Sequence, residues 1–111
     1  MRFFETIFLE NTERFLDSLD RKVIVKILYL IDLAEQTNDP KLFKKIHHDI
    51  WEFRIQHTGL QIRLLAFWDK SDNKQTLVVA THGFIKKNHK IPIREINKAV
   101  LIKRKYFDPK K

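Results

Sequence analysis

The clearest pattern in the chain covers residues 51–85, which read WEFRIQHTGLQIRLLAFWDKSDNKQTLVVATHGFI. Its opening residues alternate apolar and polar side chains, a pattern typical of a strand with one buried face. Gly59 and a later run of polar residues interrupt the apolar segments and indicate turns. Because strands joined by short turns pair with their neighbours, we expect an antiparallel meander. The predicted strands are residues 51–55, 62–68 and 76–85, and the predicted turns are residues 58–59 and 70–74.

The segment before this meander has a different period. Apolar residues recur at helical spacing over about residues 11–19 and 21–36, which predicts a hairpin of two helices. Asn38-Asp39-Pro40 ends the second helix, because proline cannot continue one. A short strand, FFETIFL, is expected before the hairpin at residues 3–9. Residues 41–49 are ambiguous, and their apolar side chains fit a short turn of helix.

The chain ends in a further predicted helix. Pro92 suits its first turn, and Ile96, Val100 and Phe107 fall on one face at helical spacing. The predicted order of elements is therefore β-α-α-β-β-β-α. We expect one α+β domain over residues 1–111, with a small antiparallel sheet, an N-terminal helical hairpin and a C-terminal helix, the helices packed on one side of the sheet.

The positive charge of the chain is concentrated in its last quarter. Residues 1–85 carry 12 basic and 12 acidic residues, which cancel. A neutral body with one cationic end is suited to holding a polyanion in a defined orientation, although such runs also serve only as solvated tails. The rest of the chain supplies the whole net charge of +8, from ten cations against Glu95 and Asp108: Lys86, Lys87, Lys90, Arg94, Lys98, Lys103, Arg104, Lys105, Lys110 and Lys111.

The composition also narrows the class of protein. The absence of cysteine rules out disulfides and thiolate chemistry and fits a reducing cytosol. Glu5 interrupts the N-terminal apolar run, so no signal peptide is expected. Lys26 and Asp32 break the longest apolar stretch, so no membrane-spanning helix is expected either. We therefore expect a soluble, cytoplasmic protein.

Cations on and beside the predicted sheet are the candidate functional residues. Arg54 and Arg63 lie on adjacent strands on either side of the Gly59 turn. Four more cationic or imidazole side chains follow the predicted strand 76–85: Lys86, Lys87, His89 and Lys90. If the strand of Arg63 is central, they converge with Arg54 and Arg63 on one edge of one sheet face. Such a cluster is able to cleave RNA without a metal or another cofactor, because the 2′-hydroxyl attacks its own phosphate while cations hold the extra negative charge. Arginine offers bidentate contact to phosphate, and histidine titrates near neutral pH.

Each of these residues also has a structural interpretation. Arg63 interrupts an apolar strand, where a buried arginine needs a partner, and Glu52 across the hairpin is the natural one. His82 lies in an apolar strand and fits a hydrogen-bonded core residue. His47 and His48 are adjacent, so their rings point apart and no metal site is expected. Four aromatic residues suit either base stacking or the core: Trp51, Phe53, Phe67 and Trp68.

The segments WEFRI, HTG, IRLLAFW, THGFIKKNHKIP and REINKA resemble the RelE-type toxins of toxin–antitoxin modules, and specifically the HigB-like branch of the RelE/ParE superfamily. The most specific part is a strand that ends in HGF-x-KK, followed by a lysine, a proline and a helix that opens with REI. The resemblance covers nearly the whole chain, since the N-terminal strand and helical hairpin also fit the family's layout.

This resemblance implies a ribosome-dependent, metal-independent mRNA endoribonuclease (an mRNA interferase) that inhibits translation. It also implies a HigA-like antitoxin with a helix-turn-helix domain, and contact with operator DNA only through that antitoxin. By position, Arg54 and Arg63 match the family's strand cations, and Arg63 matches the arginine that contacts the scissile phosphate. Lys86, Lys87 and Lys90 match its basic residues after the last strand.

The chain departs from better-known family members in one respect. They carry a tyrosine near the start of the last helix, whereas no tyrosine lies between Tyr29 and Tyr106 here. In those members the tyrosine helps to activate the 2′-hydroxyl. Here either His89 or Lys90 does so, or proton transfer is handled differently. On the solvent face of the last helix, three further cations are candidates for binding RNA or the ribosome: Arg94, Lys98 and Lys105.

Two alternative functions remain open from the sequence. The same fold and cations would suit a non-catalytic RNA- or DNA-binding module, with affinity that depends on salt. A ParE-like poison of DNA gyrase shares the fold but lacks the nuclease residues, so the cations argue against it. Fold alone does not license an activity, and our preference for the nuclease rests on where the cations lie.

Overall fold

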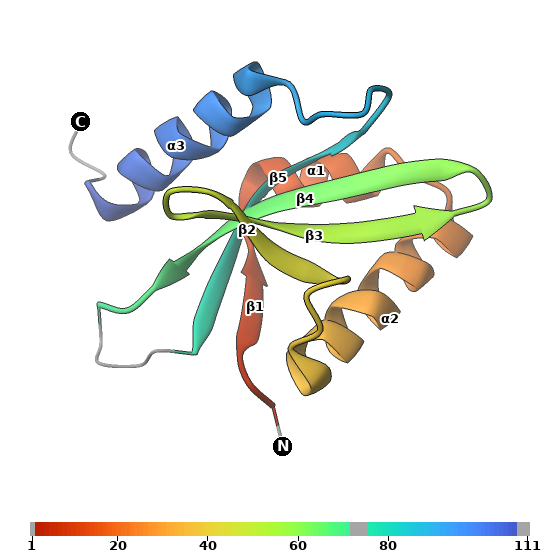
Figure 1. Cartoon of the computed structure of the whole chain (residues 1–111), viewed down its shortest axis with the longest axis horizontal. Coiled ribbons are helices and arrows are strands. Elements are labelled where there is room, and N and C mark those ends of the chain that lie inside the picture. The colour runs from red at the N-terminus through yellow and green to blue at the C-terminus, as the bar shows by residue number, and fades with distance from the viewer. Residues whose placement is uncertain (1, 72–75, 109–111) are drawn as a thin grey trace.

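The computed structural model describes residues 2–71 and 76–108. In these residues, five strands form one sheet, and three helices pack on its two faces (Figure 1). In chain order the elements are β1 (Glu5–Phe8), α1 (Glu10–Asp17), α2 (Arg21–Thr37), β2 (Phe43–His47), β3 (Ile50–His57), β4 (Leu60–Asp69), β5 (Leu77–Ile85) and α3 (Ile93–Phe107). The α+β class, the helical hairpin and the C-terminal helix are confirmed. The predicted turn at residues 70–74 lies partly outside the described residues.

The strands are arranged in the order β1-β5-β4-β3-β2. The predicted meander of β3, β4 and β5 is confirmed, and each pair in it is antiparallel. β1 pairs with β5 in parallel, with Glu5 opposite Leu77 and Phe8 opposite Ala80. The nearly continuous apolar runs of β4 and β5 are explained by their central positions, because a strand covered on both faces needs apolar residues on both.

The segment that the sequence left ambiguous, with a short helical turn as one option, contains the edge strand β2. Its first residue, Phe43, is buried and stacks on Phe53 and Trp51, with ring centroids 4.4 and 5.0 Å apart. Pairing with β3 satisfies the backbone groups on the inner side of β2, up to an irregularity between Lys45 and His47. Contacts with residues distant in sequence therefore override the weak local preference. The observed order is β-α-α-β-β-β-β-α.

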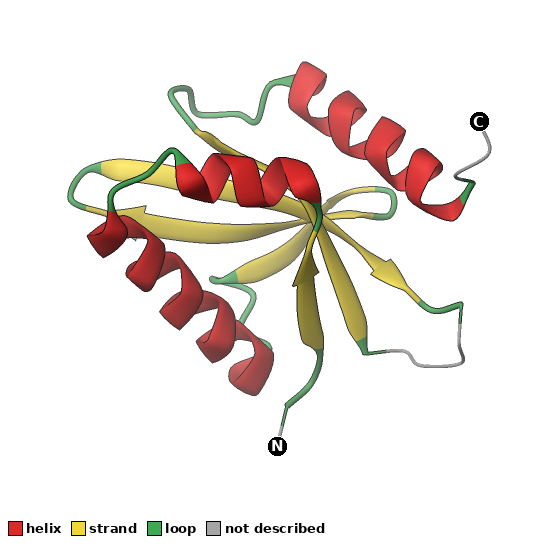
Figure 2. Cartoon of the chain, turned by 180° about the vertical axis from the view of Figure 1, so that it is seen from behind, coloured by secondary structure: helices red, strands yellow, loops and turns green. Residues whose placement is uncertain are grey.

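The helices lie on two sides of the sheet, so the expected packing on one side is wrong. α1 and α2 cover one face, where Ile27 and Ala34 of α2 meet Phe53 and Leu64 of the sheet. α3 covers the other face, where Ala99 packs with Ile50 and Leu65. Figure 1 shows α1 behind the strands, and Figure 2, seen from behind, shows it in front of them. The apolar stripe of α3 docks on the second face because β3 and β4 present apolar side chains on both.

Helix α1 lies unusually close to β5. A Cβ atom on Gly83 would stand 2.3 Å from Cδ2 of Phe15, so only glycine allows this approach. The Thr12 hydroxyl on the same helix donates a buried hydrogen bond of 2.9 Å to the carbonyl of Ala80. Together these contacts fix the helix against the strand whose end leads to the cationic segment.

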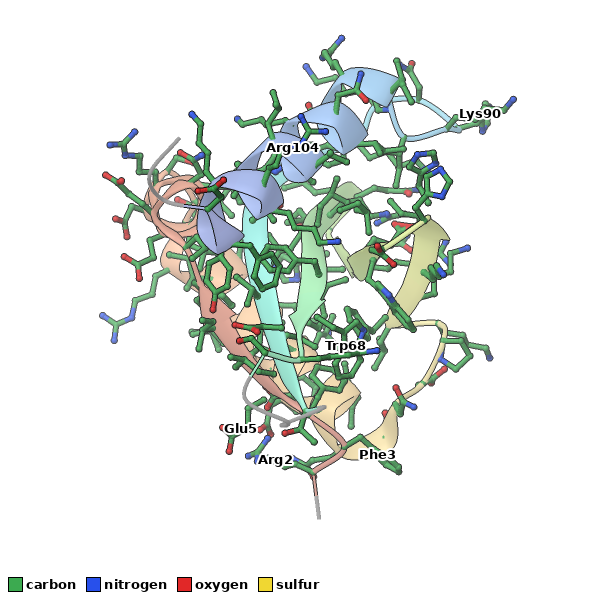
Figure 3. The ribbon with its side chains drawn as sticks, turned by 90° about the vertical axis from the view of Figure 1, so that its left-hand side faces the viewer. Arg2, Phe3, Glu5, Trp68, Lys90 and Arg104 are labelled. Carbon is green, nitrogen blue, oxygen red and sulfur yellow. The ribbon has the colours of Figure 1, made fainter. Side chains whose placement is uncertain are left out.

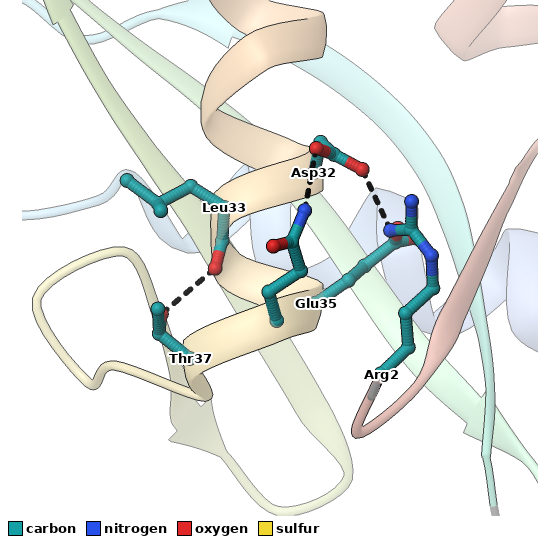
Figure 4. A network of polar contacts seen from close by, with 6 residues as sticks. Arg2, Asp32, Leu33, Glu35 and Thr37 are labelled. Carbon is teal, nitrogen blue, oxygen red and sulfur yellow. Dashed lines mark hydrogen bonds and ion pairs between the residues drawn. The ribbon is translucent and has the colours of Figure 1, made fainter.

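A network of polar contacts fastens the N-terminal segment to α2 (Figure 4). The Arg2 guanidinium lies 2.6 Å from carboxylate oxygens of both Asp32 and Glu35. The amide of Phe3 donates to the carbonyl of Glu35 at 2.7 Å. Asn38 ends the helix in the left-handed conformation, with φ of 52°, which asparagine tolerates better than most residues.

Within residues 2–71 and 76–108, no helix combines the length and the apolar character needed to cross a lipid bilayer.

Candidate functional site

A hollow of about 400 Å³ lies between the β2–β3 hairpin and the segment that joins β5 to α3. We call it the cationic groove, because one acidic side chain, Glu52, lies among six basic or imidazole side chains in its wall. Ile46, Ile91 and Ile96 supply apolar wall. The basic and imidazole residues are Lys44, Lys45, Arg54, Lys86, His89 and Lys90.

Strand pairing explains why these side chains meet. Lys44 of β2 is opposite Glu52 of β3, and Arg54 of β3 is opposite Arg63 of β4. Side chains two residues apart share a face of a strand, so Glu52 and Arg54 point to the same side. That side is the one covered by α3, because the intervening Phe53 packs under α2. The sheet register therefore aligns Lys44, Arg54 and Arg63 on one face.

Arg63 is buried, with 4% of its side chain exposed, and it makes the ion pair with Glu52 that its sequence context suggested. Its Nε lies 2.9 Å from Oε1 of Glu52, but the N–H does not point at that oxygen, so the contact is one of charge rather than a hydrogen bond. The terminal nitrogens donate to the carbonyl of Ile62 at 3.0 Å and to Oε1 of Gln61 at 3.2 Å. Burial lowers the pKa of Arg63, the nearby Glu52 opposes that change, and Arg54 adds to it.

Lys86 is half-buried beside this pair. Its backbone amide donates to the carbonyl of Gln61 at 2.7 Å, which holds it next to the start of β4. Burial lowers the pKa of the Lys86 ammonium, and the positive charges of Arg63, Arg54 and Lys44 lower it further. Glu52 opposes this change, yet the cations around Lys86 still lower its pKa, and an anion bound among them would relieve their repulsion.

The other predicted cations are more exposed. His89 and Lys90 lie on the rim of the cationic groove, and Lys90 projects from the segment before α3 in Figure 3. Lys87 lines an adjoining hollow with His89 and Gln61. Arg94 lies 4.0 Å from Glu95 and is largely exposed. Lys98 and Lys105 are exposed on α3 and do not line the cationic groove.

The segment between β5 and α3, residues 86–92, is also anchored where it leads into α3. His82 of β5 is 2% exposed, and its Nε2 lies 3.1 Å from Oε1 of Glu95 in the first turn of α3. Its Nδ1 lies 3.0 Å from the hydroxyl of Thr81. Burial lowers the pKa of His82, partly offset by Glu95 and reinforced by Lys98. His82 is thus the hydrogen-bonded core residue that its sequence context suggested.

Lys44 and Lys45 were not among the residues predicted from the sequence. Both lie on β2, the strand that the apolar pattern did not reveal. Two neighbouring lysines beside Phe43 and Ile46 were the available signal, because an edge strand often carries lysine. Among the residues that the structure describes, no group of three or more His, Asp or Glu side chains is arranged to hold a metal ion.

Comparisons with known proteins place this geometry in context. The model of a family described as phage-derived protein Gp49-like matches residues 14–104. The RelBE2 toxin–antitoxin complex from Mycobacterium tuberculosis aligns with a TM-score of 0.58 and 15% identity, over 78% of this chain and 100% of that chain. The archaeal RelE–RelB complex from Pyrococcus horikoshii OT3 gives a TM-score of 0.52 and 13% identity, over 80% of this chain and 99% of that one. No curated protein matches. At these identities the likeness is one of fold, and the predicted RelE-like fold is confirmed.

Proposed function

Because the chain belongs to the phage-derived Gp49-like family and has a RelE-like fold, we propose that it is the toxin of a type II toxin–antitoxin module. We further propose that it is a ribosome-dependent endoribonuclease that cleaves mRNA and so inhibits translation. The observation that carries this proposal is the cationic groove, in which Lys44, Arg54 and Lys86 surround a space large enough for a phosphate.

The proposed chemistry needs no metal. The 2′-hydroxyl of one nucleotide loses its proton and attacks the neighbouring phosphorus, and the bond to the 5′-oxygen breaks. This yields a 2′,3′-cyclic phosphate and a protonated 5′-hydroxyl. The additional negative charge on the phosphate oxygens is stabilised by fixed cations that need not reorganise during the reaction. Arg54 and Lys86 take that role, because both are half-buried in the wall of the groove.

Arg63 acts as a positioning residue in this proposal. Its guanidinium is buried and engaged by Glu52, Ile62 and Gln61. It stands directly opposite Arg54 in the strand register, so its charge directs the more accessible arginine toward the groove. This differs from the direct phosphate contact that the family resemblance implied for Arg63.

His89 is the proposed proton-transfer group. It lines the groove on the segment that follows β5, and Lys90 lies beside it. Histidine is the side chain that most often acts as a general acid or base in enzymes. Lys87, Arg94, Lys98 and Lys105 are proposed to bind the RNA backbone or the ribosome, because they extend the positive charge beyond the groove.

The proposed partner is an antitoxin. Both solved complexes with this fold pair a RelE-type protein with a second chain, RelB in the archaeal case. For this chain we propose a HigA-like antitoxin with a helix-turn-helix domain, through which the pair would contact operator DNA. The ribosome and its bound mRNA are the proposed target.

Primer extension on cellular mRNA after brief induction tests the nuclease. We expect the parent to produce discrete cuts and Arg54→Ala to reduce them about 100-fold, as removal of a charge-stabilising donor does in other enzymes. Arg14→Ala is the matched control, because Arg14 is exposed and forms an ion pair with Glu10 on its own helix.

Three results would contradict the proposal. Intact mRNA with DNA-damage signalling would indicate a gyrase poison. Retained RNA binding without cuts on translating ribosomes would indicate a binding module. Equal cutting by Arg54→Ala and the parent would remove the cationic groove from the mechanism. Purified protein alone is expected to cut naked RNA poorly.

A further inference from the structure

A second hollow, of about 630 Å³, lies at the other end of α3. We call it the indole pocket, because Trp51 of β3 and Trp68 of β4 both line it. Its wall also contains Lys45 of β2, Lys70 after β4, and Lys103 and Phe107 of α3. In Figure 1 the β2–β3 turn, the end of β4 and the C-terminal end of α3 gather on the left, and Figure 3 looks onto this side and draws Trp68 below α3.

The two indole rings are held firmly but are not fully buried. Their centroids lie 5.8 Å apart at an interplanar angle of 77°. Trp51 stacks on Phe43 at 5.0 Å, and Trp68 meets the edge of Phe4 at 5.5 Å. Both side chains remain half-exposed. Rings that are fixed on one side by the core and open on the other offer a prepared surface for a flat ligand.

The charges around the indole pocket favour an anionic ligand. Lys45, Lys70 and Lys103 surround the rings, and Asp49 is the acidic residue in the wall. Asp49 is 3.2 Å from Nζ of Lys103, and that contact lowers the pKa of the Asp49 carboxyl. This leaves the lysines in excess. Aromatic rings beside lysines are the combination that binds single-stranded nucleic acid, through base stacking and phosphate contact.

The indole pocket and the cationic groove are connected through Lys45. This residue lines both hollows, and it lies at the irregularity in the β2–β3 pairing. Trp51 and Arg54 are three residues apart on β3, about 10 Å at 3.3 Å per residue, and point to opposite faces. The exposed lysine side chain at the edge strand bridges the two faces. A short length of extended RNA would cross the sheet edge there.

We propose that the indole pocket binds a nucleobase of the same RNA strand whose phosphate lies in the cationic groove. The base stacks on an indole ring, while Lys45 and Lys70 contact the flanking phosphates. The inference rests on the proposed function for the identity of the ligand. It adds a base-binding subsite outside the cationic groove, where the proposed cleavage takes place. This subsite would hold the mRNA next to the cleaved bond.

Intrinsic fluorescence provides a direct test, because the chain has two tryptophans and both line the indole pocket. The probe is a single-stranded 2′-O-methyl RNA oligonucleotide, which lacks the attacking hydroxyl. We expect saturable quenching of tryptophan emission as the oligonucleotide is added. The single-tryptophan variants Trp51→Phe and Trp68→Phe show which ring responds, and each keeps an aromatic ring in the core.

Two controls separate base stacking from general attraction to phosphate. An abasic oligonucleotide of equal length keeps the charge, and we expect it to bind more weakly, by about tenfold, and to leave the fluorescence unchanged. Lys70→Ala is expected to weaken binding of the intact oligonucleotide several-fold. Lys22→Ala removes the same charge from an exposed position on α2 outside the pocket, and it is expected to bind like the parent.

The possible results are distinct. Binding seen by fluorescence anisotropy without quenching, equal quenching by the abasic strand, or no binding at all would overturn the proposal. Quenching that depends on bases, together with uncut mRNA on ribosomes, would support the indole pocket while refuting the nuclease. If Arg54→Ala loses cleavage but its tryptophan emission is still quenched normally, the two hollows have separate roles: the cationic groove in cleavage and the indole pocket in base binding.

Discussion

The two faces of the sheet differ in what they bury. Under α1 and α2 the core is built from aliphatic and aromatic side chains, with Phe53 and Ile27 among the most completely enclosed. Under α3 the sheet encloses every buried ionisable residue of the described chain: Glu52, Arg63 and His82, each at most 4% exposed. Burial of charge costs stability unless each group is paired. The contrast therefore separates a face that supplies stability from a face that keeps charged groups in place for binding.

The largest expected effect comes from the apolar face. Phe53→Ala removes a ring that stacks 4.4 Å from Phe43 and lies near Phe4. We expect the free energy of unfolding to fall by about 3–5 kcal/mol, as for other buried phenylalanines. Urea denaturation measures this loss. Phe3→Ala is the matched control, because Phe3 is 55% exposed and its removal should cost about 0.5 kcal/mol or less. Similar losses for the two variants would contradict the stated role of this face.

The buried ion pair on the other face gives a sharper comparison. Glu52→Leu alone leaves Arg63 buried without its carboxylate and should cost about 3 kcal/mol. The double variant Glu52→Leu/Arg63→Met replaces the pair with apolar groups and should recover most or all of that loss. Urea denaturation and the primer-extension assay are run on the same variants. A stable double variant that no longer cuts mRNA would show that the pair serves function; one that cuts normally would refute this.

The smallest expected effect concerns pH. Burial lowers the pKa of His82 below its ordinary value of 6.5, despite Glu95 and with the help of Lys98. The unfolded chain therefore binds a proton more readily than the folded chain does. This contribution to stability is complete above about pH 6.5 and is lost as the pH falls toward the folded-state pKa.

Thermal unfolding between pH 5 and pH 8 measures the effect, and His82→Gln should flatten the slope below about pH 6.5. His89→Gln is the matched control, because His89 is exposed. An unchanged slope in His82→Gln would show that other groups govern the acid response.

Much of this architecture could be predicted from the sequence, because the signals are local. Alternation and turn residues over 51–85 specify the meander, and helical periodicity specifies α1, α2 and α3. β2 could not be predicted in the same way. FKKIH places two lysines together and contains an irregularity, and what makes it a strand is the packing of Phe43 on rings from other parts of the chain.

The candidate site was predictable to a similar degree. Arg54, Lys86, His89 and Lys90 follow from strand pairing and from the position of the last helix. Lys44 and Lys45 were missed because they depend on β2. The burial of Arg63 was one of two interpretations that the sequence left open, since a pattern of residue types does not reveal which face α3 covers.

The parallel pairing of β1 with β5 has a consequence for synthesis of the protein. Glu5 and Leu77 are partners in the sheet but are far apart in the sequence. Because β5 is synthesised long after β1, β1 has no partner in the sheet until β5 has emerged from the ribosome. The apolar side chains that β1 will bury stay accessible to other proteins over that interval.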